Sequence, residues 1–195
     1  MDHVAHRSLS TSLPNILTYG RMVAVPVLAG LLFFGTGDVA RWLAFAIFVA
    51  ACLTDWLDGY LARIWEQQSN LGRMLDPIAD KLLVGATLLM LVYTGTIGGW
   101  AIWAALIILS REILVSGLRE FLAELNVKIH VTQLAKWKTA VQFVALAMLL
   151  VGPAAEGILP GTTTAGVLLL WIAALLTLLT GYDYLKAGIR HAIDR

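Results

Sequence analysis

Long stretches without a charged residue or a histidine constrain this chain more than any other feature. The longest, Leu82–Ser110, has 29 residues, and shorter ones cover Met22–Gly37, Trp42–Thr54, Thr139–Ala155 and Gly157–Tyr182. A helix needs roughly 20 apolar residues to cross a bilayer core. Only 14% of the residues are charged, against roughly 25% in a soluble domain. The sequence therefore predicts an all-α, polytopic membrane protein.

The longest run could form one long helix or a hairpin of two helices. Its centre, Thr94–Gly99, contains three glycines, and clustered glycine favours a turn. We therefore predict a hairpin, which gives six transmembrane helices in a single domain over residues 1–195. Their approximate ranges are 14–34, 40–64, 72–93, 99–122, 134–152 and 163–186.

The positions of the basic residues favour six spans over five. With six, nearly all Lys and Arg fall at one face and only Arg41 lies at the other, whereas five spans would split them evenly. The positive-inside rule then predicts that both termini are cytoplasmic, in a cytoplasmic (inner) membrane. The fourteen Lys and Arg form no basic tract, so nucleic acid is not an expected partner.

Several charge-free runs are too short to span a bilayer alone. Trp42–Thr54 has 13 residues, and each half of the hairpin run is of similar length. These helices must draw polar residues from their cytoplasmic ends to membrane depth, where such residues face a wet cavity. We therefore expect a polar cavity that is open to the cytoplasmic side.

Two pairs of aspartates lie where this cavity is expected. Asp55 and Asp58 share one helical face at spacing i, i+3, and Asp76 and Asp80 share another at i, i+4. They could be unrelated acidic residues at helix ends, but each carboxylate at depth costs roughly 2.5–3.5 kcal/mol. Four clustered negative charges also repel one another and need counter-ions. Two divalent cations would balance the charge, and carboxylate oxygens favour Mg²⁺ or Mn²⁺.

These aspartates belong to a longer pattern. The sequence resembles the signature D-x2-D-G-x2-A-R-x8-G-x3-D-x3-D of the CDP-alcohol phosphatidyltransferases at every fixed position from Asp55 to Asp80. The resemblance implies a six-helix membrane fold and a homodimer. It also implies transfer of a phosphatidyl or similar group from a CDP-linked donor to an alcohol, with release of CMP and dependence on Mg²⁺ or Mn²⁺.

The resemblance also implies roles for individual residues. Asp55, Asp58 and Asp76 would hold metal, while Asp80 would complete the metal site and act as the general base. Residues that would bind the donor, CDP-diacylglycerol, are Asn15, Thr18, Asp55, Gly59, Ala62, Arg63, Ser69 and Gly72.

The second half of the chain bears on the acceptor alcohol. The segments Arg111–Glu124 and Lys136–Gln142 resemble family members whose acceptor is sn-glycerol 3-phosphate. Cations that would suit the phosphate of this acceptor are Arg21, Arg111, Arg119, Lys136 and Lys138. Basic residues at cytoplasmic helix ends are also expected from the positive-inside rule alone. Glu112 points away from Arg111 and is predicted to pair with another charge or another helix.

Other functions stay open from sequence alone. Serine, inositol phosphate or phosphatidylglycerol could replace glycerol 3-phosphate as acceptor. A cation or proton transporter is the rival from another class, because such proteins also use intramembrane carboxylates. All four aspartates fall in the cytoplasmic half of the predicted spans. This favours the enzyme, since a transport path needs polar groups on both sides of the midplane.

Overall fold

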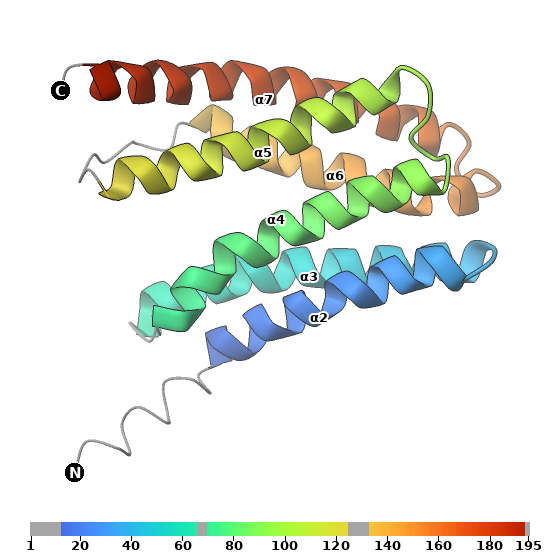
Figure 1. The fold of residues 1–195 in the computed structure, drawn as a ribbon. Coiled ribbons are helices and arrows are strands. Elements are labelled where there is room, and N and C mark those ends of the chain that lie inside the picture. The colour runs from blue at the N-terminus through green and yellow to red at the C-terminus, as the bar shows by residue number, and fades with distance from the viewer. Residues whose placement is uncertain (1–12, 66–69, 125–132, 194–195) are drawn as a thin grey trace, which may run out of the picture. The chain divides into compact units, whose positions relative to one another are not determined.

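The computed structural model describes residues 13–65, 70–124 and 133–193, and the described chain is helical apart from short connections (Figure 1). The helices are α2 (Leu13–Phe34), α3 (Asp38–Trp65), α4 (Asn70–Tyr93), α5 (Ala101–Glu124), α6 (Gln133–Ala155) and α7 (Thr162–Ile193). The prediction of an all-α chain with six long helices is confirmed for these residues.

The turn predicted at Thr94–Gly99 separates α4 from α5. Gly95 and Gly99 have φ angles of 71° and 53°, in the left-handed region that glycine enters without steric cost. The amide of Gly95 donates to the carbonyl of Val92 at 3.0 Å, and the amide of Ile97 donates to that of Leu91 at 3.0 Å. These bonds satisfy carbonyls that the end of α4 leaves open. The predicted break of the long apolar run into two helices is therefore confirmed.

The predicted boundaries agree with the structure to within three residues, except at the end of the last helix. That helix was expected to end at residue 186, and α7 continues to Ile193. The extension contains Arg190 and His191, so hydropathy gives no signal for it.

Within the described residues, four helices are long and apolar enough to cross a membrane. The candidate spans are Asn15–Phe34, Ala101–Ala123, Gln133–Ala155 and Thr162–Tyr182. The described parts of α3 and α4 are not among these candidates. These apolar helices identify the chain as a membrane protein. The count of six spans stays a prediction.

The chain forms two compact units, which span Met1–Met90 and Leu91–Arg195. In the first unit α2 packs on α3, and Leu28, Ala44 and Phe48 are fully buried. In the second, α7 packs on both α5 and α6. A Cβ atom at Gly166 of α7 would lie only 2.9 Å from the Leu149 side chain, so glycine permits the close approach of α6 and α7.

Glu156 stabilises the connection between α6 and α7 through hydrogen bonds. Its carboxylate accepts hydrogen bonds from the backbone amides of Gly161 and Thr163, both at 2.8 Å. Because these amides stabilise the charged form, the pKa of Glu156 lies below its usual value. The carboxylate thereby satisfies donors in the first turn of α7.

Candidate functional site

Three signature carboxylates belong to the first unit. Asp55 lies on α3, while Asp76 and Asp80 lie on α4, and all three residues are partly buried. Asp55 lies within electrostatic range of Asp76, and Cys52 lies within range of both Asp55 and Asp80. The helices α3 and α4 therefore bring negative charge from both halves of the signature to one region.

Helix α2 supplies two partners for these carboxylates. The Thr18 hydroxyl donates to Asp76 Oδ1 at 2.6 Å, and the Arg21 guanidinium forms an ion pair with Asp55. Thr18 and Arg21 are almost fully buried, whereas the Asp55 side chain is 38% exposed. Because Thr18 and Arg21 are three residues apart, they project from the same side of α2. Helix α2 thus orients one carboxylate from each half of the signature.

These contacts were not predicted for the two residues, whose binding roles stay predictions. Thr18 was predicted to bind the nucleotide, and it contacts a predicted metal ligand. Arg21 was predicted to bind the acceptor's phosphate, and its guanidinium is engaged by Asp55. The three-residue spacing of Thr18 and Arg21 indicates that they share one face of a helix. It does not indicate that this face contacts Asp55 and Asp76. Asn15, one turn before Thr18, is also buried.

Several predicted site residues have only their helical position described. Asp58, Gly59, Ala62 and Arg63 lie in α3 and Gly72 lies in α4, but their side chains are outside the described part of the structure. Ser69 lies wholly outside the described residues. Among the side chains that are described, no three of the types His, Cys, Asp and Glu are gathered as a metal site.

The described donor set nevertheless suits a hard divalent cation. Asp55, Asp76 and Asp80 offer carboxylate oxygens, and the Cys52 thiol lies near Asp55 and Asp80. Mg²⁺ and Mn²⁺ prefer oxygen ligands, whereas zinc sites use mostly His and Cys. The Arg21 guanidinium beside Asp55 shows that this carboxylate is placed to contact positive charge.

A cavity of about 360 Å³ lies between α2 and α3 beside these residues. Its lining is mostly apolar, with Ile16, Leu17 and Ile47 among the contributors, and Arg21 and Thr54 are its polar members. Arg21, which contacts Asp55, therefore also lines a mostly apolar cavity.

The second unit holds a separate group of charges. Lys138 of α6 forms an ion pair with Glu112 of α5, and Arg111 lies 3.6 Å from the same carboxylate. Arg111 also donates to Thr180 Oγ1 of α7 at 3.1 Å. The side chains of Lys138, Glu112 and Arg111 are mostly buried. The prediction that Glu112 pairs with another charge is confirmed.

The five predicted acceptor-binding cations therefore have different surroundings. Arg21 and Lys138 are buried in ion pairs, and Arg111 contacts Thr180 within its own unit. Arg119 and Lys136 are exposed.

Known proteins are similar to this chain over both units described above. The sequence model of the family CDP-alcohol phosphatidyltransferase matches residues 11–179. A relative from Rickettsia prowazekii, named CDP-diacylglycerol--glycerol-3-phosphate 3-phosphatidyltransferase, is 45% identical over 92% of this chain and 96% of its own length. A protein of the same name from Cereibacter sphaeroides is 37% identical over 95% and 99%. A rice relative named cardiolipin synthase (CMP-forming) is 38% identical over 90% of this chain and 56% of its own length.

Proposed function

Because the chain belongs to the CDP-alcohol phosphatidyltransferase family, we propose that it transfers the phosphatidyl group of CDP-diacylglycerol to sn-glycerol 3-phosphate. The products are phosphatidylglycerophosphate and CMP. The acceptor is inferred from relatives that match over nearly the whole chain and are named for glycerol 3-phosphate as acceptor. The rice relative named a cardiolipin synthase supports phosphatidylglycerol as the alternative acceptor.

One experiment tests the reaction and the acceptor together. Purified protein is incubated with CDP-diacylglycerol and, separately, glycerol 3-phosphate, phosphatidylglycerol, serine or inositol phosphate, and CMP release is followed. Glycerol 3-phosphate should give the fastest release. Faster release with phosphatidylglycerol would assign the chain to the alternative reaction.

Members of this family generally depend on a divalent metal ion. Here Asp55, Asp58, Asp76 and Asp80 would hold Mg²⁺ or Mn²⁺, with two ions matching their four negative charges. Bound at these carboxylates, the ions would neutralise charge on the phosphates of the donor and on the departing CMP. The hydrogen bond from Thr18 to Asp76 supports this role, because it fixes the direction in which a carboxylate presents its second oxygen.

The chain's own residues would carry the proton transfer. The acceptor hydroxyl must lose a proton as it attacks phosphorus, and Asp80 would take it. Neighbouring carboxylates raise the basicity of such a group. Because Asp80 lies on the same helix face as Asp76, one turn away, it would meet the hydroxyl beside the bound diphosphate. Direct attack predicts inversion at the β-phosphorus of the donor.

The remaining nucleotide and lipid contacts would come from α2, α3, the start of α4 and Ser69, which precedes α4 in sequence. Asn15, Gly59, Ala62, Arg63, Ser69 and Gly72 would bind the CDP moiety. The cavity between α2 and α3 would take an apolar part of the donor, because most of its lining is apolar. Arg21, which also lines it, contacts Asp55. This arrangement would hold the donor's diphosphate next to Asp55.

Arg119 and Lys136 would bind the phosphate of the acceptor. Both side chains are exposed, and a charge-assisted contact to phosphate is among the stronger hydrogen bonds in proteins. A direct acceptor role for Arg21, Arg111 and Lys138 stays a prediction, since each already contacts another residue of its own unit.

We further propose six spans, with both termini cytoplasmic and one family domain in a homodimer in the inner membrane. The family match over residues 11–179 supports a single domain, and four apolar helices support the membrane location. In this arrangement α3 and α4 would also cross the bilayer, with their aspartates in a polar cavity near the cytoplasmic face.

A further inference from the structure

Helices α6 and α7 pack against each other along a row of facing positions. A Cβ atom at Gly152 would lie 2.7 Å from Thr163 Oγ1, and one at Gly166 would lie 2.9 Å from Leu149 Cγ. From the first pair to the second, the residue number falls by three on α6 and rises by three on α7, as in antiparallel helices. Continued in steps of three or four residues, this register pairs Ala145 with Leu170, Gln142 with Ala173 and Lys138 with Thr177, and all six residues are buried. The two helices therefore stay packed along the whole row.

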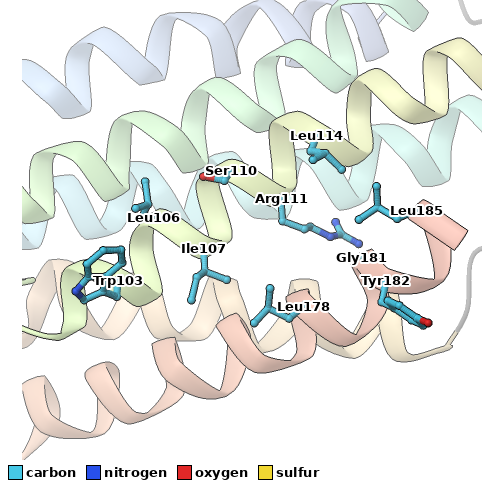
Figure 2. A pocket seen from close by; sticks show the side chains of 10 residues that line it. All are labelled: Trp103, Leu106, Ile107, Ser110, Arg111, Leu114, Leu178, Gly181, Tyr182 and Leu185. Atoms are coloured by element: carbon cyan, nitrogen blue, oxygen red, sulfur yellow. The ribbon is translucent and has the colours of Figure 1, made fainter. Parts of the chain in front are cut away.

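A cluster of mostly buried polar side chains joins the helices of the second unit at the end of this row. Lys138 of α6 forms an ion pair with Glu112 of α5. Arg111 of α5 donates to Thr180 Oγ1 of α7 at 3.1 Å, and Figure 2 shows its side chain directed toward Gly181 of α7. Direct polar contacts thus connect α5 to α6 and α5 to α7.

Two buried oxygen atoms lie on the third side of this cluster, where α6 meets α7. Gln142 and Thr177 are 2% and 0% exposed. Within the described chain, Gln142 Oε1 and Thr177 Oγ1 have no hydrogen-bond partner. Burying a polar group without a partner is costly, and most buried polar atoms of folded proteins are hydrogen-bonded to protein or to ordered water. These two oxygens therefore indicate a further partner.

The hydroxyl of Thr177 also differs from the hydroxyls of other helical threonines. Thr87, Thr139 and Thr180 each donate to the carbonyl oxygen four residues earlier in their own helix. Thr177 Oγ1 makes no such bond to Ala173 within the described chain. Because this bond is available to a threonine inside any helix, a hydroxyl that does not make it is directed toward another group.

The spacing of the two oxygens suits one water molecule. Gln142 faces Ala173, and Thr177 follows Ala173 by one turn of α7, about 6 Å along the axis. A water with hydrogen bonds of about 2.8 Å on either side bridges atoms up to about 5.6 Å apart. It would donate to Gln142 Oε1 and to the second lone pair of the Ala173 carbonyl, and it would accept from the Thr177 hydroxyl. Three hydrogen bonds are typical of a buried water.

We propose that one buried water molecule bridges Gln142 and Thr177. The bridge adds a polar contact between α6 and α7, so that every pair among α5, α6 and α7 is connected. It lies one turn from Lys138 and holds α6 against α7 where Lys138 meets Glu112. The proposal goes beyond the proposed function and does not depend on the reaction.

Water-edited solid-state NMR of the full chain in lipid bilayers detects such a water. The chain has four glutamines, whose side-chain amides are isotope-labelled, and the Gln142 signal is the one that disappears in Gln142→Met. Gln133 is exposed and serves as the reference for contact with bulk water. The Gln142 amide should receive magnetisation from water at a rate within about threefold of that of Gln133, because one ordered water at the amide is sufficient.

Two variants test whether Thr177 shares this water. Thr177→Val removes the hydroxyl at nearly constant volume and should reduce the transfer to Gln142 at least about threefold, since the water loses one of its three partners. It should also lower the melting temperature, whereas replacing a hydroxyl that has no partner would raise it. Thr139→Val is the matched control: Thr139 lies on α6 one turn from Gln142, and its hydroxyl donates to the Ala135 carbonyl at 3.1 Å. The Gln142 signal should not change in this control.

Two outcomes would overturn the proposal. Absence of transfer from water to Gln142 in the wild type would mean that the two oxygens contact each other directly or stay unpartnered, and this result needs no variant. Equal transfer in the wild type and in Thr177→Val would mean that Thr177 does not hold the water. Thr177→Ser, which keeps the hydroxyl, should keep the transfer. CMP release measured on the same bilayers reports the proposed reaction separately.

Discussion

The ion pair between Glu112 and Lys138 should stabilise the second unit, and three variants test this. The side chains of Lys138 and Glu112 are only 5% and 14% exposed. Removing one member of a buried pair costs about 3–5 kcal/mol, because the other charge is left buried. Replacing both members with neutral residues of similar size is nearly neutral. We therefore expect Lys138→Met and Glu112→Gln to destabilise the chain, and the double variant to recover most of the loss.

The position of Arg111 predicts which single variant is worse. In Lys138→Met, the Glu112 carboxylate keeps Arg111 at 3.6 Å, so the loss should lie near 3 kcal/mol. In Glu112→Gln, two buried cations lose their shared anion, and the loss should approach 5 kcal/mol. For a chain of this size, each kcal/mol lowers the melting temperature by about 2–4 °C. Lys138→Met should then melt about 6–12 °C below the wild type, and Glu112→Gln about 10–20 °C below.

Thermal unfolding of the purified chain in detergent, followed by far-ultraviolet circular dichroism, measures these shifts. Lys136→Met is the matched control, because Lys136 lies on the same helix and is exposed. Its change should stay within about 0.5 kcal/mol. If Lys138→Met melts like this control and instead raises the KM for glycerol 3-phosphate, Lys138 serves the acceptor and our reasoning on the ion pair is refuted.

Three further predictions concern the metal site and the α6–α7 connection. Asp58→Ala should release CMP at less than about 1% of the wild-type rate, since loss of a metal ligand costs several kcal/mol of transition-state stabilisation; unchanged helicity is the control. Thr18→Val should lower CMP release about 10–100-fold through loss of a hydrogen bond to a charged group, while Thr18→Ser should retain most of it; equal loss in both would contradict the role of the hydroxyl. Because the pKa of Glu156 is lowered in the folded chain, its stabilising contribution is present above the usual pKa near 4.3 and disappears as the pH falls below it. The melting temperature should therefore fall less steeply with acid in Glu156→Gln than in the wild type, and identical acid profiles would disprove the contribution.

The positions of the helices were largely predictable, because the features that determine them are local. The glycines at 95, 98 and 99 signalled the end of α4 within an otherwise continuous apolar run, and the structure breaks there. The end of α7 was not predictable in the same way. Its last residues mix apolar side chains with Arg190 and His191, and hydropathy does not distinguish a helix that continues beyond an apolar span from a loop.

Partners within one helix were also easier to predict than partners on different helices. The spacing of Asp76 and Asp80 shows directly that they share a face. The partner of Asp76, however, is Thr18, which lies 58 positions away in sequence. No periodicity reports such a contact, because it depends on how α2 packs against the signature helices. For Glu112, the sequence predicted a direction away from Arg111 and either an ion pair or a helix contact, without naming a partner. The structure pairs Glu112 with Lys138, and the Arg111 guanidinium nevertheless lies 3.6 Å from the same carboxylate.

In each of the two units a buried basic side chain is paired with a carboxylate. A charged side chain buried at membrane depth needs a partner, because transfer without one is costly. In the first unit the partner of Arg21 is Asp55, and in the second the partner of Lys138 is Glu112. A basic residue near a cytoplasmic helix end can therefore serve the fold, the membrane surface or the substrate, and sequence position alone does not separate these roles. Burial separates the first of these roles here, since the paired cations Arg21 and Lys138 are buried, whereas Arg119 and Lys136 are exposed.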